Sequence, residues 1–199
     1  MHGLINRSLE CFLSDTYGTD VWLDVTKRAN LGFEHFESMF DYDDALSYAV
    51  LEAAAARLSK TNETILEDLG TYLVSSPNVK SLRRLLRFGG VTFVDFLHSL
   101  DDLYDRAKLA VPELELPRLS LLKDSDVGGF KLICRSPHNG FGRVVLGVLR
   151  AMADDYGALV FMDYQGAGDG YEEISITLVE SSYADGRHFS LASPVGGSA

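Results

Sequence analysis

The sequence predicts an α+β domain, in which a helical N-terminal half precedes an antiparallel four-stranded sheet with one inserted helix. Two observations carry this prediction. Up to about residue 111 the apolar residues recur at helical spacing, and beyond it they alternate with a period of two. The later connections are short and the strands are half-apolar, which favours an antiparallel sheet. We therefore expect one domain over residues 1–181, with a helical part over about 1–111, a sheet part over about 112–181 and a C-terminal tail at 182–199.

Helical periodicity defines six segments before residue 112. The acidic run Asp41, Asp43 and Asp44 is better explained as the start of the third helix than as a cation site. Gly89-Gly90 is suited to ending the fifth. The sixth segment has the clearest apolar stripe, so we expect it to organise the rest of the chain. The six expected helices are Leu4–Leu13, Val21–Ala29, Ala45–Leu58, Ile65–Val74, Ser81–Arg87 and Val91–Ala110.

The second half is predicted to contain two strands, a helix and two further strands, in that order. The change of period suggests a boundary between two subdomains near residue 112. The first strand contains Pro117, which suits an edge or a kinked strand. Turns are expected at 136–140 and 166–170. The expected strands are Leu114–Leu121, Phe130–Arg135, Leu159–Tyr164 and Ile174–Leu178, and the inserted helix is Phe141–Ala153.

Composition excludes several classes of function. The chain has 18 Lys and Arg against 29 Asp and Glu, a net charge of −11, so nucleic acid and anionic membranes are poor partners. Cys11 and Cys134 lie on unrelated segments, which argues against a disulfide framework and favours a reducing cytoplasm. We find no nucleotide-binding glycine loop, no nucleophile elbow and no metal-ligand spacing of Cys and His, so the sequence does not predict an enzyme.

Two groups of residues have ligand-binding chemistry. Tyr104 extends the apolar stripe of the sixth helix, so we expect it on the buried face. A buried phenol there needs a hydrogen-bond partner, a metal or an opening to solvent, and an ordinary core tyrosine is the alternative. Cys134, Ser136 and His138 follow one another at i, i+2 and i+4, where a strand enters a turn. Such side chains point the same way, so they are expected to face one cavity, unless this is only a strand end.

The chain resembles a known family along residues 1–180. Its opening Met1-His2-Gly3-Leu4-Ile5-Asn6, with Tyr17-Gly18 and Trp22 after it, is similar to the start of H-NOX domains. These are the heme–nitric oxide/oxygen binding sensors related to the sensor domain of soluble guanylate cyclase. The similarity continues through Tyr42-Asp43-Asp44, the segment Phe96-Leu97-x-x-Leu100-Asp101-x-Leu103, Pro117 and the strand and turn at 129–140. The resemblance implies the H-NOX fold, a heme cofactor and a role in signalling.

Both signature elements of the family are altered here. The proximal heme ligand of the family is a histidine, and that position holds Tyr104, which the resemblance makes the candidate metal ligand. A phenol binds iron as phenolate and favours ferric heme. The family's propionate-binding Tyr-x-Ser-x-Arg aligns with residues 134–138, where only the serine is kept. The resemblance implies cofactor contacts at Ile5, Tyr104, Pro117, Cys134, Ser136 and His138.

Two functions follow and are both open at this point. The first is a heme-based gas or redox sensor with Tyr104 as the altered ligand. The second is a heme-free relative that acts as an interaction module or binds another apolar ligand, because the histidine and two of three propionate contacts are replaced. The resemblance implies a signalling partner such as a histidine kinase or a cyclic-diguanylate enzyme, and a diatomic gas if heme is bound.

Overall fold

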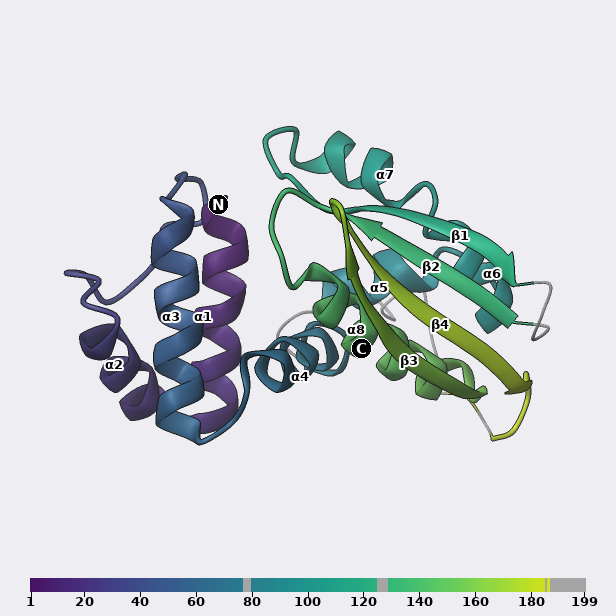
Figure 1. Cartoon of the computed structure of the whole chain (residues 1–199), viewed down its shortest axis with the longest axis horizontal. Helices are drawn as coiled ribbons and strands as arrows, with labels where there is room; N and C mark the ends of the chain where they lie inside the picture. The colour runs from purple at the N-terminus through teal and green to yellow at the C-terminus, as the bar shows by residue number, and fades with distance from the viewer. Residues whose placement is uncertain (77–79, 125–128, 185, 187–199) are drawn as a thin grey trace, which may run out of the picture.

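The first three helices form a separate group at one end of the molecule. A computed structural model describes residues 1–76, 80–124, 129–184 and 186, so the predicted tail at 182–199 lies almost wholly outside the described residues. Helices α1 (Gly3–Tyr17), α2 (Thr19–Arg28) and α3 (Asp44–Leu58) lie together at the N-terminal end (Figure 1). They match the expected segments to within a few residues. None of the helices in the described ranges is long and apolar enough to cross a membrane.

The start of α1 is fixed against the segment that leads into α3. The backbone amide of Gly3 donates to the Phe40 carbonyl at 2.6 Å, and the Tyr42 amide donates to the Met1 carbonyl at 3.0 Å. A Cβ on Gly3 would lie 2.0 Å from the Glu37 carbonyl oxygen, so only glycine permits this approach. Asp43 accepts from the Ala45 amide and caps α3, which confirms its predicted role as a helix start.

Helix α4 (Asn62–Ser75) crosses from the N-terminal helices to α8 (Phe141–Tyr156). The two helices meet through small residues from each side. A Cβ on Gly70 would lie 2.0 Å from the Val144 carbonyl oxygen, and one on Gly147 would lie 2.0 Å from the Glu67 carbonyl oxygen. The backbones therefore touch, and α4 is rigidly joined to α8.

The expected sixth helix is two helices, so the prediction of one continuous helix was wrong. Helices α6 (Phe93–Ser99) and α7 (Leu103–Ala110) follow α5 (Lys80–Arg87), and residues 100–102 form a turn between them. The Asp101 carboxylate accepts from the Leu121 amide at 2.8 Å, and Arg106 donates to the Ser99 carbonyl. The first bond ties the turn to the first strand, and the second joins α7 to the end of α6 across the turn. Helical periodicity contains neither constraint.

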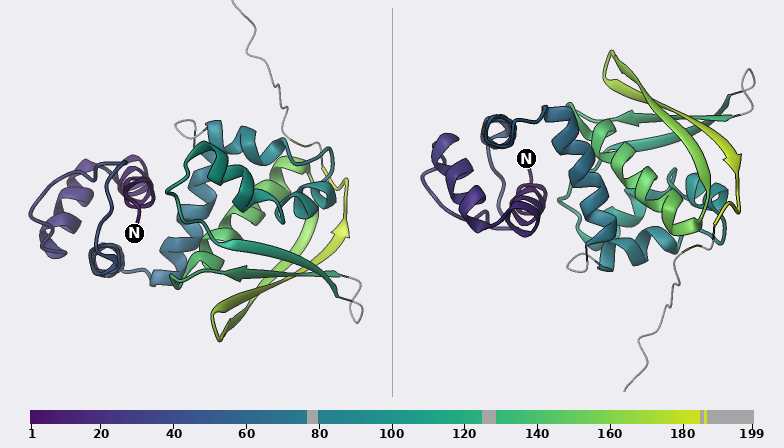
Figure 2. Two further views of the ribbon diagram at one scale, coloured as in Figure 1. Left: turned by 90° about the horizontal axis from the view of Figure 1, so that it is seen from above. Right: turned by 90° about the horizontal axis from the view of Figure 1, so that it is seen from below.

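The sheet confirms the predicted α+β class. Strands β1 (Arg118–Asp124), β2 (Gly129–Arg135), β3 (Leu159–Gly168) and β4 (Tyr171–Glu180) pair antiparallel in the order β1-β2-β4-β3. Helix α8 lies against one face of this sheet, as both views of Figure 2 show. The first strand begins at Arg118 and not at Leu114, so residues 114–117 belong to the connection before it.

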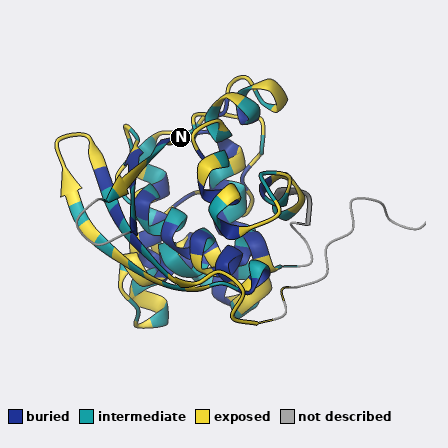
Figure 3. Cartoon of the chain, turned by 90° about the vertical axis from the view of Figure 1, so that its right-hand side faces the viewer, coloured by how far each residue is buried: buried dark blue, intermediate teal, exposed yellow. Residues whose placement is uncertain are grey.

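Buried side chains form two cores, and the buried residues gather inside where the helices and the sheet face each other (Figure 3). The first core joins α1–α3 to α4 as far as Tyr72, near the end of that helix. The second begins with Val74 in the same helix and includes α6, α8 and the sheet. The cores therefore divide within α4, whereas the sequence suggested a seam near residue 112. Periodicity marks the change from helix to strand there, but packing does not follow it.

Candidate functional site

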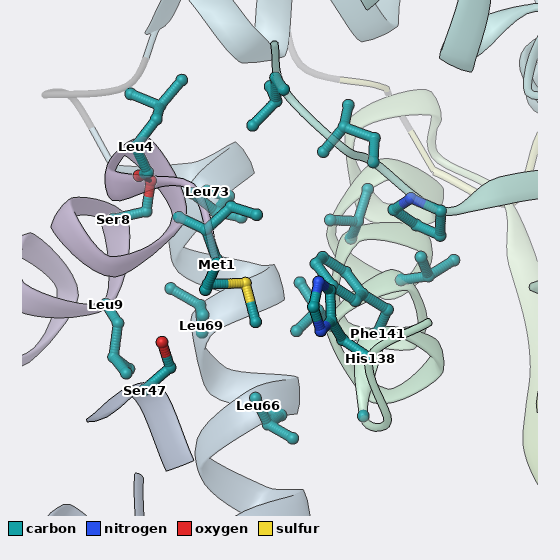
Figure 4. Close-up of a pocket in the computed structure, with 18 of the residues that line it drawn as sticks. Met1, Leu4, Ser8, Leu9, Ser47, Leu66, Leu69, Leu73, His138 and Phe141 are labelled. Atoms are coloured by element: carbon teal, nitrogen blue, oxygen red, sulfur yellow. Dashed lines mark hydrogen bonds between the residues drawn. The ribbon is translucent and has the colours of Figure 1, made fainter. Parts of the chain in front are cut away.

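An apolar cavity of about 430 Å³ lies between the two cores. Helices α1, α3 and α4 form one wall, and α7, α8 and the segment at 114–119 form the other, as the close-up in Figure 4 shows in part. This volume and this lining are typical of a small-molecule site. The few polar side chains in the lining are Asn6, Ser8, Ser47, Tyr48, His138 and Asn139.

The cavity brings together three of the six residues expected to contact a cofactor. Two of them lie on opposite walls: Ile5 in α1, and Pro117 in the connection before β1. The third, His138, lies in the loop before α8. The other three, Tyr104, Cys134 and Ser136, are not among the described residues that line it.

Tyr104 lies outside the cavity and not on the buried face, contrary to the sequence-based expectation. It is half-buried, with the Arg118 guanidinium carbon 3.9 Å and the Lys108 ammonium 5.7 Å from its ring centroid. Its neighbour Leu103 lines the cavity instead. Successive residues on a helix point about 100° apart, so the turn at 100–102, which restarts the helix, decides which of the two faces inward.

Cys134 and Ser136 lie away from the described lining of the cavity. The Cys134 thiol is fully buried in the second core, where burial and then the nearby Glu172 carboxylate raise its pKa to about 12. It therefore stays a neutral thiol at physiological pH. Ser136 accepts a hydrogen bond from the His138 amide at 3.1 Å, which shapes the turn before α8.

His138 is the one predicted polar residue in the cavity lining. Its side chain is 12% exposed, and its ring lies 6.2 Å from that of Phe141. The Nδ1 atom lies 3.2 Å from Oδ2 of Asp44, at the start of α3. In Figure 4 the Met1 side chain extends from the α1 side toward His138 and Phe141. The His138–Asp44 contact thus links the loop before α8 to the start of α3.

Asp44 is shared between the amino group of Met1 and the imidazole of His138. Its Oδ1 accepts from the amino group of Met1 at 2.6 Å, while Oδ2 faces His138. The Met1 hydrogen bond, followed by the charge of His138, lowers the pKa of Asp44 below its usual value. The carboxylate is therefore ionised at any pH near neutrality.

Asn6 is a lining residue that our sequence reading missed. It is 1% exposed, and its Oδ1 accepts from the Ser47 hydroxyl at 2.6 Å. Its Nδ2 has no hydrogen-bond partner, which is costly for a buried donor. A polar residue between Ile5 and Leu9, on the apolar side of a predicted helix, was the signal available in the sequence.

Glu172 was also missed, and it holds the element that carries His138. It is buried, accepts from the Gly142 amide at 2.9 Å in the first turn of α8, and accepts from the Tyr164 hydroxyl at 2.8 Å. Residue 140, before this helix, is a glycine and offers no side-chain cap. A carboxylate from β4 replaces the missing cap and favourably faces the positive end of the helix.

Comparison with known proteins agrees with this fold. The family model described as Haem-NO-binding matches residues 2–163. Soluble guanylate cyclase 89Da of Drosophila melanogaster is 23% identical over 164 residues, which are 82% of this chain and 24% of the fly protein. Soluble guanylate cyclase gcy-31 of Caenorhabditis elegans is 24% identical over 155 residues, 78% of this chain and 22% of the worm protein. This chain thus spans about a quarter of the length of these relatives.

Solved H-NOX structures share the fold. A variant of the S. oneidensis H-NOX protein in the Fe(II) ligation state superposes with a TM-score of 0.76 at 17% identity, covering 92% of this chain and 98% of the other. A variant of the Fe(II) unliganded K. algicida protein gives 0.76 at 16% identity, with 90% and 97% covered. At this identity the likeness concerns the fold alone.

The chain belongs to the Haem-NO-binding, or H-NOX, family, because the family model covers more than half of it. Domains of this family are heme-based gas sensors of signalling proteins. The residues of the cavity fit such a cofactor in two respects, since the lining is largely apolar and includes one imidazole. They depart from it in one: no arginine or lysine is among the described residues of the lining, so propionates have no cationic side chain there.

Proposed function

We propose that this chain is a sensor domain that holds heme in the cavity between its two cores, without Tyr104 as the iron ligand. The observation that supports this most is the apolar cavity of about 430 Å³, which has an imidazole at its edge. When bound, heme supplies an iron centre that takes a diatomic gas or changes its oxidation state. We take residues 1–181 as the domain and the cytoplasm as its location.

The position of the cavity favours a sensing role over a storage role. Its walls belong to different cores, joined along the chain by α4 and across the cavity by the His138–Asp44 contact. A ligand that fills the cavity contacts both walls. A change in ligand size or position therefore alters how α1 and α3 rest against α8, which a partner protein senses at the surface.

The test is reconstitution of the purified chain with hemin, in ferric and reduced forms, followed by desalting. We expect a Soret band that survives desalting and saturates at one heme per chain. A matched variant, Val148→Trp, fills the cavity from α8 and should abolish this band while leaving the circular dichroism spectrum unchanged. A band of equal strength in both proteins would place the heme elsewhere and overturn the proposal.

A heme-free sensor is the second candidate, and the lack of a cationic side chain in the described lining favours it. In that case the cavity takes an apolar ligand without iron. An apolar fluorophore whose emission rises on burial should then bind the wild-type chain and not Val148→Trp, while no Soret band forms. The two candidates thus give different results with the same pair of proteins.

The partner is a proposal by analogy with the family. The named relatives are soluble guanylate cyclases, and this chain spans about a quarter of their length. We infer an output through a separate or attached signalling protein, such as a histidine kinase, a cyclic-diguanylate enzyme or a cyclase. A change in the partner's activity when the liganded and ligand-free forms of this chain are added in turn is the expected result.

A further inference from the structure

Three cationic side chains lie near the start of β1 without a carboxylate partner. They are Arg118, Arg135 and Lys108, and no acidic side chain in the part of the chain that the structure describes forms an ion pair with any of them. Carboxylates are abundant in this chain, with 29 acidic residues against 18 basic ones, and other arginines use them, as Arg28 does with Asp24. The cluster thus holds positive charge that the described part of the chain does not neutralise.

Arg118 and Arg135 lie directly opposite each other in the sheet. They are Cα partners in the antiparallel pairing of β1 with β2, and both are exposed. Side chains of opposite residues leave a sheet on the same face, with their Cβ atoms about 5 Å apart. The next pair along the two strands, Leu119 and Cys134, is buried in the second core, so the two arginines leave the sheet on the other face. Like charges placed in this way destabilise a sheet, and an anion bound between them removes the repulsion.

Helix α7, which lies beside β1, provides the third cation and orients the first (Figure 1). The guanidinium carbon of Arg118 lies 3.9 Å and the ammonium of Lys108 5.7 Å from the centroid of the Tyr104 ring. The Lys108 ammonium also donates to the Pro112 carbonyl at 2.8 Å. The guanidinium of Arg118 forms no hydrogen bond with the described residues, so its N–H groups remain available to a ligand.

We propose that Arg118, Arg135 and Lys108 form a binding site for a phosphate monoester on the surface of this chain. Two guanidinium groups and an ammonium match the charge and the three oxygens of a phosphate dianion better than those of a single carboxylate. The net charge of −11 acts against nucleic acid and anionic membranes, so an isolated phosphate group suits this surface better than a long polyanion. The site lies outside the cavity, and the inference does not depend on the proposed heme function.

Tyr104 has a positioning role in this site. Its ring favours one orientation of the Arg118 guanidinium, so the arginine loses less conformational freedom when an anion binds. Tyr104→Phe keeps the ring and should leave the affinity within about twofold of the wild type, whereas Tyr104→Leu should lower it by about threefold. An equal loss in both variants would overturn the positioning role of the ring.

The test is a titration of the full chain with phenyl phosphate, observed by NMR of ¹⁵N-labelled arginine side chains. The Nε–Hε signals of Arg118 and Arg135 should shift and saturate together, while acetate at equal ionic strength should leave them nearly unchanged. Arg135→Gln should lower the affinity by up to about fivefold, the effect of losing one exposed charge interaction.

Lys123→Gln is the matched control, because it removes the same charge from the other end of β1. Five residues along a strand span about 16 Å, which exceeds the screening length of about 8 Å at physiological salt. This variant should therefore bind phenyl phosphate as the wild type does. A loss equal to that of Arg135→Gln would mean that the anion responds only to total charge, and would overturn the proposal.

Thermal unfolding provides a second measurement. Phenyl phosphate should raise the Tm of the wild type more than that of the double variant Arg118→Gln, Arg135→Gln, because only the wild type gains binding energy in the folded state. Equal shifts in the two proteins would show a general salt effect and overturn the proposal.

The source of the phosphate group is distinguished with a short phosphoserine peptide. Tighter binding of the peptide than of phenyl phosphate would support a phosphorylated protein as the ligand, and equal binding would support a small phosphate ester. If neither arginine signal responds to phenyl phosphate or to the peptide, the proposal is overturned, and the proposed heme function is unaffected.

Discussion

Helices α7 and α8 line the same wall of the cavity, but they are held in very different ways. Eight of the sixteen residues of α8 are buried, whereas Ala107 alone is buried among the eight residues of α7. The residue that the family uses for iron corresponds to a position on the weakly held helix, and the imidazole in the cavity precedes the firmly held one. An alignment gives the place of a residue along the fold. The direction of its side chain depends on how firmly its helix or strand is packed against the rest of the protein.

The largest effect should come from removing the carboxylate that holds the start of α8. Glu172→Ala leaves the Gly142 amide and the Tyr164 hydroxyl without their buried acceptor. We expect the free energy of unfolding to fall by about 3 kcal/mol, measured by urea titration and circular dichroism. Glu172→Gln keeps one acceptor and should cost about 1–2 kcal/mol. Equal losses in the two variants would show that charge, and not hydrogen bonding, holds α8.

A second test concerns the close contact between the backbones of α4 and α8. Gly147→Ala places a methyl group 2.0 Å from the Glu67 carbonyl oxygen, and Gly70→Ala does the same against Val144. Each should lower the free energy of unfolding by about 2 kcal/mol, because backbone must move to make room.

The double variant sharpens this test. Once one methyl group has separated the helices, the second meets less resistance, so the double loss should be smaller than the sum of the single losses. Ala110→Gly on α7, an exposed position near a helix end, is the control and should cost less than about 1 kcal/mol. Strict additivity would mean that the two contacts are independent and that α4 and α8 do not separate as a unit.

Much of the fold could be predicted from the sequence because its signals are local. The change of period from 3.6 to 2 located the helices and strands, and Asp43 marked the start of α3 as the structure confirms. The antiparallel sheet followed from short connections between alternating segments. Family similarity indicated the H-NOX fold, and the likeness to solved H-NOX structures confirms it.

The site was harder to predict because it depends on contacts between distant residues. The break between α6 and α7 depends on Asp101 reaching the amide of Leu121, and this break is what separates Tyr104 from the cavity. Asp44 and His138 are far apart in the sequence and meet only when the two cores are assembled. A cavity is a space that side chains leave unfilled, and no residue pattern marks it.

Alkaline pH should lower the free energy of unfolding, because ionisation of Tyr164 removes its hydrogen bond to Glu172, the residue that holds the start of α8. Desolvation, followed by the hydrogen bond to Glu172, raises the pKa of Tyr164 to about 12 from an ordinary value of 10.0. A raised pKa means that the folded state favours the protonated phenol, so its contribution is complete below pH 10 and disappears between about pH 10 and 12. We expect about 1 kcal/mol of stability to be lost in that range, after allowance for solvent screening.

Tyr164→Phe should remove this part of the pH dependence, as judged from urea unfolding at several pH values. Tyr72→Phe is the matched control in the first core, because burial and the hydrogen bond to Asp15 also raise the pKa of Tyr72 to about 12. Each substitution should flatten part of the alkaline decline, and the part that remains should include the contribution of the buried Cys134 thiol, whose pKa burial also raises to about 12. A decline unchanged by Tyr164→Phe would show that its phenol gains nothing from Glu172.

The smallest effect belongs to Tyr104, and its size tests whether α7 carries a site at all. With the Arg118 guanidinium 3.9 Å from its ring centroid, Tyr104 makes a cation–π contact at the surface. A double-mutant cycle of Tyr104→Ala and Arg118→Ala should give a coupling of about 0.5–1 kcal/mol in the free energy of unfolding. Tyr104→Phe keeps the ring and should change stability by less than about 0.5 kcal/mol. A coupling above about 2 kcal/mol would mean that this pair is desolvated, and α7 would then be as firmly anchored as α8.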